Sequence, residues 1–279
     1  MQLELPWELG PPDGRYVLRG HAGEPEHILV LDTLGAPQRR LLGGRRSRRA
    51  DADPPPEPVA TARATLIRAR PFETPDAAEA WLGEADLEAE AADAVSVLNR
   101  VLHAHRTASA DPYVREVAQA QALVVRVGIG EGDQVAHGRW AQARRLPHDR
   151  GGRARGGRRT SALRPQERLA ALLAGRDAAL ACEELALRAR LDLDRSRSRE
   201  AALQLRVALE AGLAELQAWA HHGDLGERLA ELREARGAVA AAANRALEGG
   251  LDTEQIEEVD RILGRLEAAL AARVAAGLE

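Results

Sequence analysis

The chain has 279 residues, of which 45% are hydrophobic and 29% charged, and its formal net charge is −4 at pH 7. This length accommodates two modest domains, or one domain with an extension, and the composition is that of a globular protein. Only 3% of the residues are aromatic, so the apolar residues are mostly Ala, Leu and Val. Such a composition favours helices packed against helices over a thick sheet sandwich.

Several classes of protein are excluded at this stage. Cys182 is the single cysteine, so we expect neither a disulfide framework nor a thiolate zinc cluster. The first residues, "MQLELPWELGPPDG", have no basic start and no long apolar run, so we predict no secretory signal. Nowhere do about 18 apolar residues follow one another, which argues against a membrane span. We therefore expect a cytoplasmic protein.

The basic residues are all of one kind, because the sequence contains 39 arginines and no lysine. Arginine ordinarily indicates recognition of phosphate or carboxylate groups through two parallel hydrogen bonds. Because arginine is the one basic residue type in this chain besides histidine, its presence at a position does not by itself indicate such recognition. The clustering of positive charge along the chain remains informative.

Three segments near the N-terminus are predicted to be strands: residues 15–19, 27–31 and 59–70. They are short, rich in Val, Ile, Leu or Thr, and bounded by Gly and Pro. Arg68 and Arg70 alternate with apolar residues, as in a sheet with one solvated face. We predict an antiparallel three-stranded sheet, which needs helices across one face to form a core.

Helical signals begin at Thr74, which is the expected N-cap before Pro75. This helix is predicted to extend to about His105. A second helix is predicted over residues 111–127, where apolar residues recur at helical spacing, and a weaker third over residues 133–146.

Beyond residue 160 the helical pattern is regular. Four amphipathic segments are predicted, at residues 161–193, 199–220, 224–247 and 252–274, the first with a possible break near Gly175. Their apolar stripes are Leu169, Leu173, Leu180, Leu187 and Leu191; Leu205, Leu209, Leu213 and Leu216; Leu225, Leu229, Leu232, Val239 and Leu247; and Ile256, Val259, Leu263, Leu266 and Leu270. Asp252 is the predicted N-cap of the last helix.

The predicted fold is therefore α+β and predominantly α, with a small N-terminal antiparallel three-stranded sheet with helices, followed by a C-terminal antiparallel helical bundle. We place the N-terminal domain at residues 1–146, a linker rich in Arg and Gly at 147–160, and the bundle at 161–279. Residues 36–58 are basic and rich in Pro, and we predict a flexible loop there.

Positive charge gathers in two places. Residues 39–49 contain six arginines and no acid, and residues 144–159, which include "RGGRARGGRR", contain seven arginines and one acid. Such segments can bind a phosphate backbone, or they can be solvated linkers that touch the protein's own acidic helices. The candidate nucleic-acid-binding residues are Arg45, Arg46, Arg48, Arg49, Arg150, Arg153, Arg155, Arg158 and Arg159.

Other motifs have simpler explanations. In "VGIGEGDQ", residues 127–134, the glycines are spaced by two throughout, so the dinucleotide pattern is absent, and a helix-helix turn capped by Asp133 explains the residues. Metal ligands on one face of a helix are three or four residues apart. This spacing is absent from the histidine pairs His103 and His105, and His221 and His222. We predict neither a metal site nor a cofactor.

For catalysis, the acidic run at residues 84–93 is typical of a solvated helix face, and Cys182 lies in an Ala-Leu helix, as a small buried hydrophobic residue would. No catalytic residues are predicted, and an enzyme is disfavoured but left open.

Two functional hypotheses remain. The first is a non-catalytic interaction or adaptor protein that contacts a protein partner, or a second copy of itself, through its C-terminal helices. The second is an RNA- or DNA-associated protein that uses the two arginine-rich segments.

Overall fold

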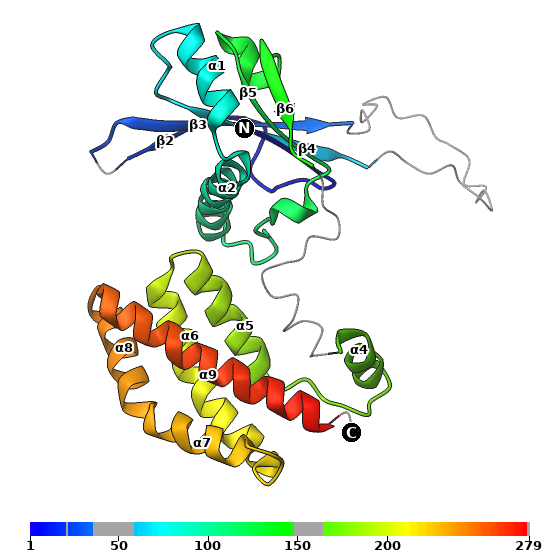
Figure 1. The fold of residues 1–279 in the computed structure, drawn as a ribbon, viewed down its shortest axis with the longest axis vertical. Helices are drawn as coiled ribbons and strands as arrows, with labels where there is room; N and C mark the ends of the chain where they lie inside the picture. The colour runs from blue at the N-terminus through cyan, green and yellow to red at the C-terminus, as the bar shows by residue number, and fades with distance from the viewer. Residues whose placement is uncertain (21, 36–58, 148–163, 278–279) are drawn as a thin grey trace, which may run out of the picture. The chain divides into compact units, whose positions relative to one another are not determined.

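The computed structural model describes residues 1–20, 22–35, 59–147 and 164–277. The chain divides into two compact units, Met1–Gly152 and Arg153–Glu279. We call them the N-terminal unit and the helical unit (Figure 1). The predicted loop at residues 36–58 lies outside the described residues, as does the predicted linker 147–160 apart from Pro147.

The N-terminal unit contains a six-stranded sheet in the order β2-β3-β4-β1-β5-β6, in which every neighbouring pair is antiparallel. The strands are β1 (Gln2–Leu5), β2 (Gly14–Arg19), β3 (Pro25–Leu34), β4 (Thr61–Arg68), β5 (Val124–Ile129) and β6 (Gln142–Arg145). The three predicted strands correspond to β2, β3 and β4, and their antiparallel order is confirmed. The prediction of a sheet with three strands was wrong, because β1, β5 and β6 complete it.

The missed strands have identifiable causes. β1 has four residues, which is too short for a periodic pattern. β5 lies in the segment predicted as a helix over 111–127, because Val124 and Val127 are also one helical turn apart. That helix is absent from the structure, where only a short 3₁₀ turn, Gln119–Gln121, precedes β5. Residues 133–146 likewise form a 3₁₀ turn, η2 (Asp133–His137), and β6 instead of the predicted third helix.

Helices α1 (Pro75–Glu84) and α2 (Leu87–Ser109) replace the single helix predicted from Thr74. The predicted N-cap is confirmed, since the Thr74 hydroxyl accepts a hydrogen bond of 3.1 Å from the Ala77 amide. Helix α2 lies against one face of the sheet (Figure 1), and its apolar side chains join the core there. The residues that form this core include Leu3, Leu5, Leu29, Leu31, Val125, Ala91, Ala94, Val95, Leu98 and Leu102.

The helical unit contains the helices α4 (Pro165–Leu173), α5 (Ala181–Asp194), α6 (Ser198–Glu215), α7 (Leu225–Glu234), α8 (Arg236–Glu248) and α9 (Thr253–Gly277), with a 3₁₀ turn, Leu216–Trp219, after α6. A helical C-terminal half is confirmed. The predicted first segment is interrupted at Gly175, whose φ of +67° favours glycine, and the third is divided at Ala235. No helix in the described ranges is both long and apolar enough to cross a membrane.

The apolar stripe of α9 lies inside the helical unit, except that Ile256 at its start is only half-buried. Val259, Leu263, Leu266 and Leu270 are all buried, and they join one core with residues of α5, α6, α7 and α8. The predicted N-cap of this helix is also confirmed, because an Asp252 carboxylate oxygen accepts a bond of 2.8 Å from the Gln255 amide. The stripe predicted for α6 is buried in the same core, as are Leu225, Leu229, Leu232 and Val239 of the third stripe. The prediction was wrong for Leu247, the last member of that stripe, because it is 66% exposed near the end of α8.

The stripe predicted for residues 161–193 was wrong. Leu169, Leu173, Leu187 and Leu191 are exposed by 52%, 80%, 67% and 45%. The buried side of α5 instead carries the small residues Cys182, Ala186 and Ala189.

Small residues suit the buried side of α5 because this helix lies close to α6. A Cβ atom added at Gly212 of α6 would stand 3.7 Å from the Cys182 Cβ atom and 3.0 Å from a Leu266 methyl group. Leucine on that side of α5 would overfill this space. The leucines of α5 therefore occupy the outer side of the helix.

The burial of Leu263 gives a stability prediction. Its replacement by alanine removes buried methyl groups and leaves a cavity, so Leu263→Ala should lower the free energy of unfolding by about 2–5 kcal/mol. The matched control is Leu247→Ala on α8, where the side chain is 66% exposed and the change should stay within about 0.5 kcal/mol. Urea unfolding of both variants measures the difference. Equal effects of the two substitutions would contradict the packing of α9.

Candidate functional site

Helices α4 and α5 of the helical unit each carry a pair of exposed leucines. Leu187 and Leu191 are four residues apart on α5, and Leu169 and Leu173 are four residues apart on α4. Residues at this spacing lie on one face of a helix. We call these four side chains the outer leucines. An ion pair of 2.9 Å between Glu184 and Arg188 flanks Leu187 on α5.

Helix α4 is held on the helical unit mainly by charge. Ala171 is its one buried residue, so little apolar surface anchors it. Arg168 of α4 instead donates hydrogen bonds of 2.6 and 2.8 Å to the Glu183 carboxylate at the start of α5. The same guanidinium donates to Asp177 at 3.3 Å, in the segment between the two helices.

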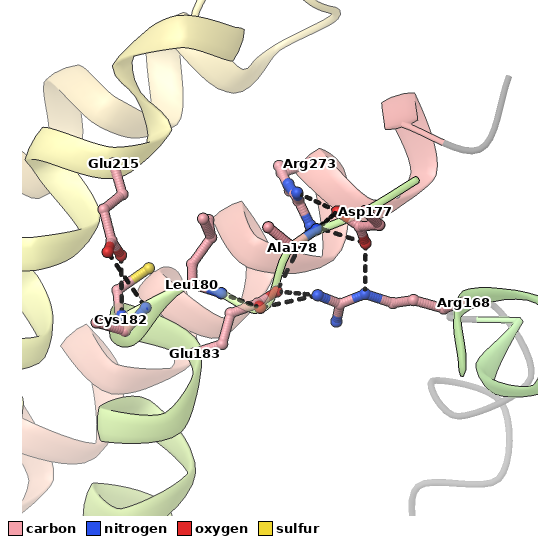
Figure 2. Close-up of polar contacts among 9 residues, drawn as sticks. Arg168, Asp177, Ala178, Leu180, Cys182, Glu183, Glu215 and Arg273 are labelled. Carbon is pink, nitrogen blue, oxygen red and sulfur yellow. Dashed lines mark hydrogen bonds and ion pairs between the residues drawn. The ribbon is translucent and has the colours of Figure 1, made fainter. Parts of the chain in front are cut away.

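A second guanidinium, from α9, completes this cluster. Arg273 is 5% exposed, and it forms an ion pair of 2.5 Å with Asp177 and approaches Glu183 to 3.9 Å. Its guanidinium also lies 4.8 Å from the ring centroid of Trp219. Figure 2 shows the two arginines reaching the carboxylates from α4 and from α9. We call Arg168, Asp177, Glu183 and Arg273 the charge cluster.

Ionisation in the charge cluster follows from these contacts. Burial opposes the charged form of Asp177, but the hydrogen bonds from Arg273, from the Ala178 amide and from Arg168 outweigh it, so the Asp177 pKa is lowered. The pKa of Arg168 is raised, because its bonds to Glu183 and Asp177 outweigh its own desolvation. Every member is paired with an opposite charge, so the cluster acts as a structural link between α4, α5 and α9.

Cys182 lies next to this cluster, at the start of α5, and is fully buried. The Glu215 carboxylate accepts hydrogen bonds from the Cys182 and Ala181 amides, at 2.9 and 3.2 Å (Figure 2). Burial, together with this nearby carboxylate, raises the pKa of the Cys182 thiol to about 12. Its full burial, with its Cβ atom close to Gly212 of α6, makes Cys182 a packing residue.

The N-terminal unit contains a separate concave site with a volume of about 590 Å³. Strands β4 and β5 extend past the start of β1, and residues from both line the site, with α1 and η2 contributing to its walls. Phe72, Trp81 and Trp140 are among the lining residues. We call this site the aromatic hollow.

Close packing fixes the position of Trp140. A Cβ atom at Gly128 would lie 2.1 Å from the Trp140 ring, so β5 accepts the indole here only because the residue is glycine. The indole NH also donates a hydrogen bond of 2.9 Å to the Val135 carbonyl in η2. Gly128 and Gly130 of "VGIGEG" therefore allow close contact with Trp140. The helix-helix turn predicted here was wrong, because a strand precedes η2 and Asp133 makes no side-chain cap.

Two ion pairs lie along the aromatic hollow. Arg68 bonds to Glu90 at 2.5 Å, and Arg15 bonds to Asp133 at 3.0 Å. The Met1 α-amine also lines the site and donates to the Leu66 carbonyl at 2.9 Å. Burial and then the nearby Arg68 lower the pKa of this amine to about 6, against an opposing effect of Glu90. The amine therefore contributes little positive charge at pH 7.

The arginines predicted to bind nucleic acid lie outside the described residues: Arg45, Arg46, Arg48, Arg49, Arg150, Arg153, Arg155, Arg158 and Arg159. Among the described ranges, no group of three or more His, Cys, Asp or Glu residues is arranged to hold a metal ion.

The sequence reading missed both the outer leucines and the aromatic hollow. A signal for the hollow was present, because aromatic residues are rare here and three of the seven converge on it.

Comparison with protein-family models, with curated proteins and with solved structures finds no significant match to this chain.

The charge cluster gives a second stability prediction. Asp177→Asn removes the charge opposite Arg273, which is buried, so we expect a loss of about 2–4 kcal/mol in the free energy of unfolding at pH 7. The control is Asp224→Asn, since the Asp224–Arg228 pair is exposed and should contribute less than about 1 kcal/mol.

The pH dependence of the same variant follows from the direction of the shift. A lowered pKa in the folded state stabilises the protein above the ordinary aspartate pKa of about 4, and this stabilisation is lost as the pH falls through the folded pKa. Urea unfolding between pH 7 and pH 2 should therefore show a smaller loss of stability in Asp177→Asn than in the unsubstituted protein. Parallel pH profiles would contradict this role of Asp177.

Proposed function

We propose that this protein is a non-catalytic interaction protein that contacts another protein, or a second copy of itself, through the outer leucines of its helical unit. The observation that supports the proposal is the exposure of Leu187 and Leu191, one turn apart, on a helix whose inner side is fully packed. An amphipathic helix that inserts leucines at this spacing into an apolar groove is a common mode of recognition between proteins.

The surroundings of these leucines fit a binding surface. Interfaces combine an apolar centre with a polar, solvent-accessible rim. Arg188 and Glu184 lie beside Leu187, and both are more than half exposed. On α4, the exposed Leu169 and Leu173 present a second apolar pair, and the charge cluster holds that helix in place.

This proposal is tested with the double variant Leu187→Ser, Leu191→Ser. Removing both apolar side chains should abolish self-association, measured by sedimentation velocity, or the binding of a protein identified by crosslinking at these positions. Truncating central apolar anchors of an interface commonly costs about 2 kcal/mol or more each. Because both side chains are exposed, the urea midpoint should stay close to that of the unsubstituted protein.

The control for this experiment is Leu247→Ser, which changes an equally exposed leucine on α8. It should leave association intact. Association that survives the double variant, or that is lost equally in the control, would contradict a role for the outer leucines of α5.

A second candidate function is binding to a nucleic-acid backbone. The observation that favours it is β6, a strand at the edge of the sheet whose residues Arg144 and Arg145 are both exposed. Arg145 makes one long contact of 3.5 Å, to the Leu123 carbonyl, and Arg144 has no ion-pair partner among the described residues. These two arginines begin the basic stretch 144–159.

For this candidate we predict that replacing Arg153, Arg155, Arg158 and Arg159 with Ser weakens binding to DNA of any sequence. Each lost phosphate contact should reduce the slope of log K against log salt concentration by roughly 0.9 on duplex DNA. Fluorescence anisotropy at several salt concentrations measures both effects. Absence of binding by the unsubstituted protein at low salt would eliminate the candidate.

A further inference from the structure

We propose that the aromatic hollow of the N-terminal unit binds a small organic cation with a planar or apolar body. The hollow is independent of the outer leucines, so this inference goes beyond the proposed function. It is supported by the size of the site, by the aromatic residues that gather there, by the balance of charges along it and by one buried histidine nitrogen that forms no hydrogen bond among the described residues.

The size and the walls of the hollow suit a small molecule. Its volume of about 590 Å³ lies in the usual range of ligand pockets, roughly 300–1,000 Å³. The chain has four tryptophans, two tyrosines and one phenylalanine, and three of these seven rings line this one site. Phe72 and Trp81 lie with their centroids 5.5 Å apart, and Phe72 is 43% exposed.

Both tryptophans of the hollow already attract a cation. The guanidinium of Arg68 lies 5.5 Å from the Trp81 ring centroid, and that of Arg126 lies 5.7 Å from the Trp140 ring centroid. Tryptophan is the aromatic side chain that attracts cations most strongly, at distances up to about 6 Å. Both rings already hold a guanidinium of the protein itself, and aromatic walls of this kind attract a positively charged ligand more than a negatively charged one.

The charged residues along the hollow also favour a positively charged ligand. Five carboxylates and three guanidiniums line it, and the Arg68–Glu90 and Arg15–Asp133 pairs satisfy two of each. The remaining carboxylates belong to Glu73, Asp93 and Glu131, all exposed, and they form no ion pair within the described ranges. Arg70 is the one guanidinium left against them. The excess of negative charge attracts a cation by complementarity.

A buried acceptor is also available in the lining. His27 is 8% exposed, and its Nδ1 atom is buried with no hydrogen-bond partner among the described residues. The nearest carboxylate oxygen, from Glu26, is 3.9 Å away. A buried polar atom without a partner is costly, and in the neutral form of the ring Nδ1 can accept a hydrogen bond from a ligand N–H group. A ligand N–H group that reaches this atom would satisfy it.

The experiment compares three ligands of nearly the same shape: benzamidinium, neutral benzamide and anionic benzoate. The full-length protein is titrated with each at low ionic strength, and binding is followed by calorimetry and by tryptophan fluorescence. We expect saturable binding of benzamidinium, at least about tenfold tighter than that of benzamide, and no binding of benzoate.

The variant Glu73→Gln, Asp93→Asn, Glu131→Gln removes the unpaired carboxylates without touching the core, and it should weaken benzamidinium binding about tenfold. Phe72→Leu should also weaken it, because an aromatic wall is lost. The control Glu84→Gln changes an exposed acid of α1 that does not line the hollow, and it should leave affinity unchanged. Circular dichroism of each variant checks that the fold is retained.

Three outcomes would overturn the inference. The first is a dissociation constant for benzamidinium above about 10 mM. The second is equal binding of benzamide or benzoate, which would show that charge does not select the ligand. The third is an affinity that the triple variant leaves unchanged. Association through the outer leucines is measured separately, so its failure and the failure of this inference are distinguishable.

Discussion

Hydrogen bonding along β1 joins the two parts of the N-terminal sheet, because this strand lies between β4, which continues to β3 and β2, and β5, which continues to β6. Leu3 and Leu5 point into the core and are at most 1% exposed. Gln2 is fully buried, and its amide donates a hydrogen bond of 3.0 Å to the Thr65 hydroxyl. Both neighbours of β1 are distant in sequence, so the sheet closes only when segments far apart in the chain come together.

The aromatic hollow is a consequence of this arrangement. β4 and β5 flank β1 and extend beyond it, and the space along their free ends is walled by α1 and η2. Gly128 lets Trp140 lie directly against β5, which gives the hollow a rigid wall. The same strands therefore supply part of the core and, at their free ends, a concave, charged surface.

In the helical unit, apolar burial and ion pairing stabilise different helices. The inner helices are held by a continuous apolar core in which α5 contributes small residues, so its leucines remain outside. Helix α4 buries little and depends on Arg168, Asp177, Glu183 and Arg273. A buried ion pair fixes geometry more than it adds net stability, because desolvation offsets much of the attraction. Ion pairs thus position α4, and apolar burial stabilises the other helices of the unit.

The sequence by itself determined the local features: the meander β2-β3-β4, the caps Thr74 and Asp252, and the buried stripes of α6, α7 and α9. Each depends on neighbours within one element or one turn. Tertiary structure alone decided the rest. β5 is a strand because β1 pairs with it, which outweighs its helical spacing. Leu187 and Leu191 are exposed because α6 approaches the alanine side of α5. Phe72, Trp81 and Trp140 line one hollow because α1, β5 and η2 converge, which no local pattern encodes.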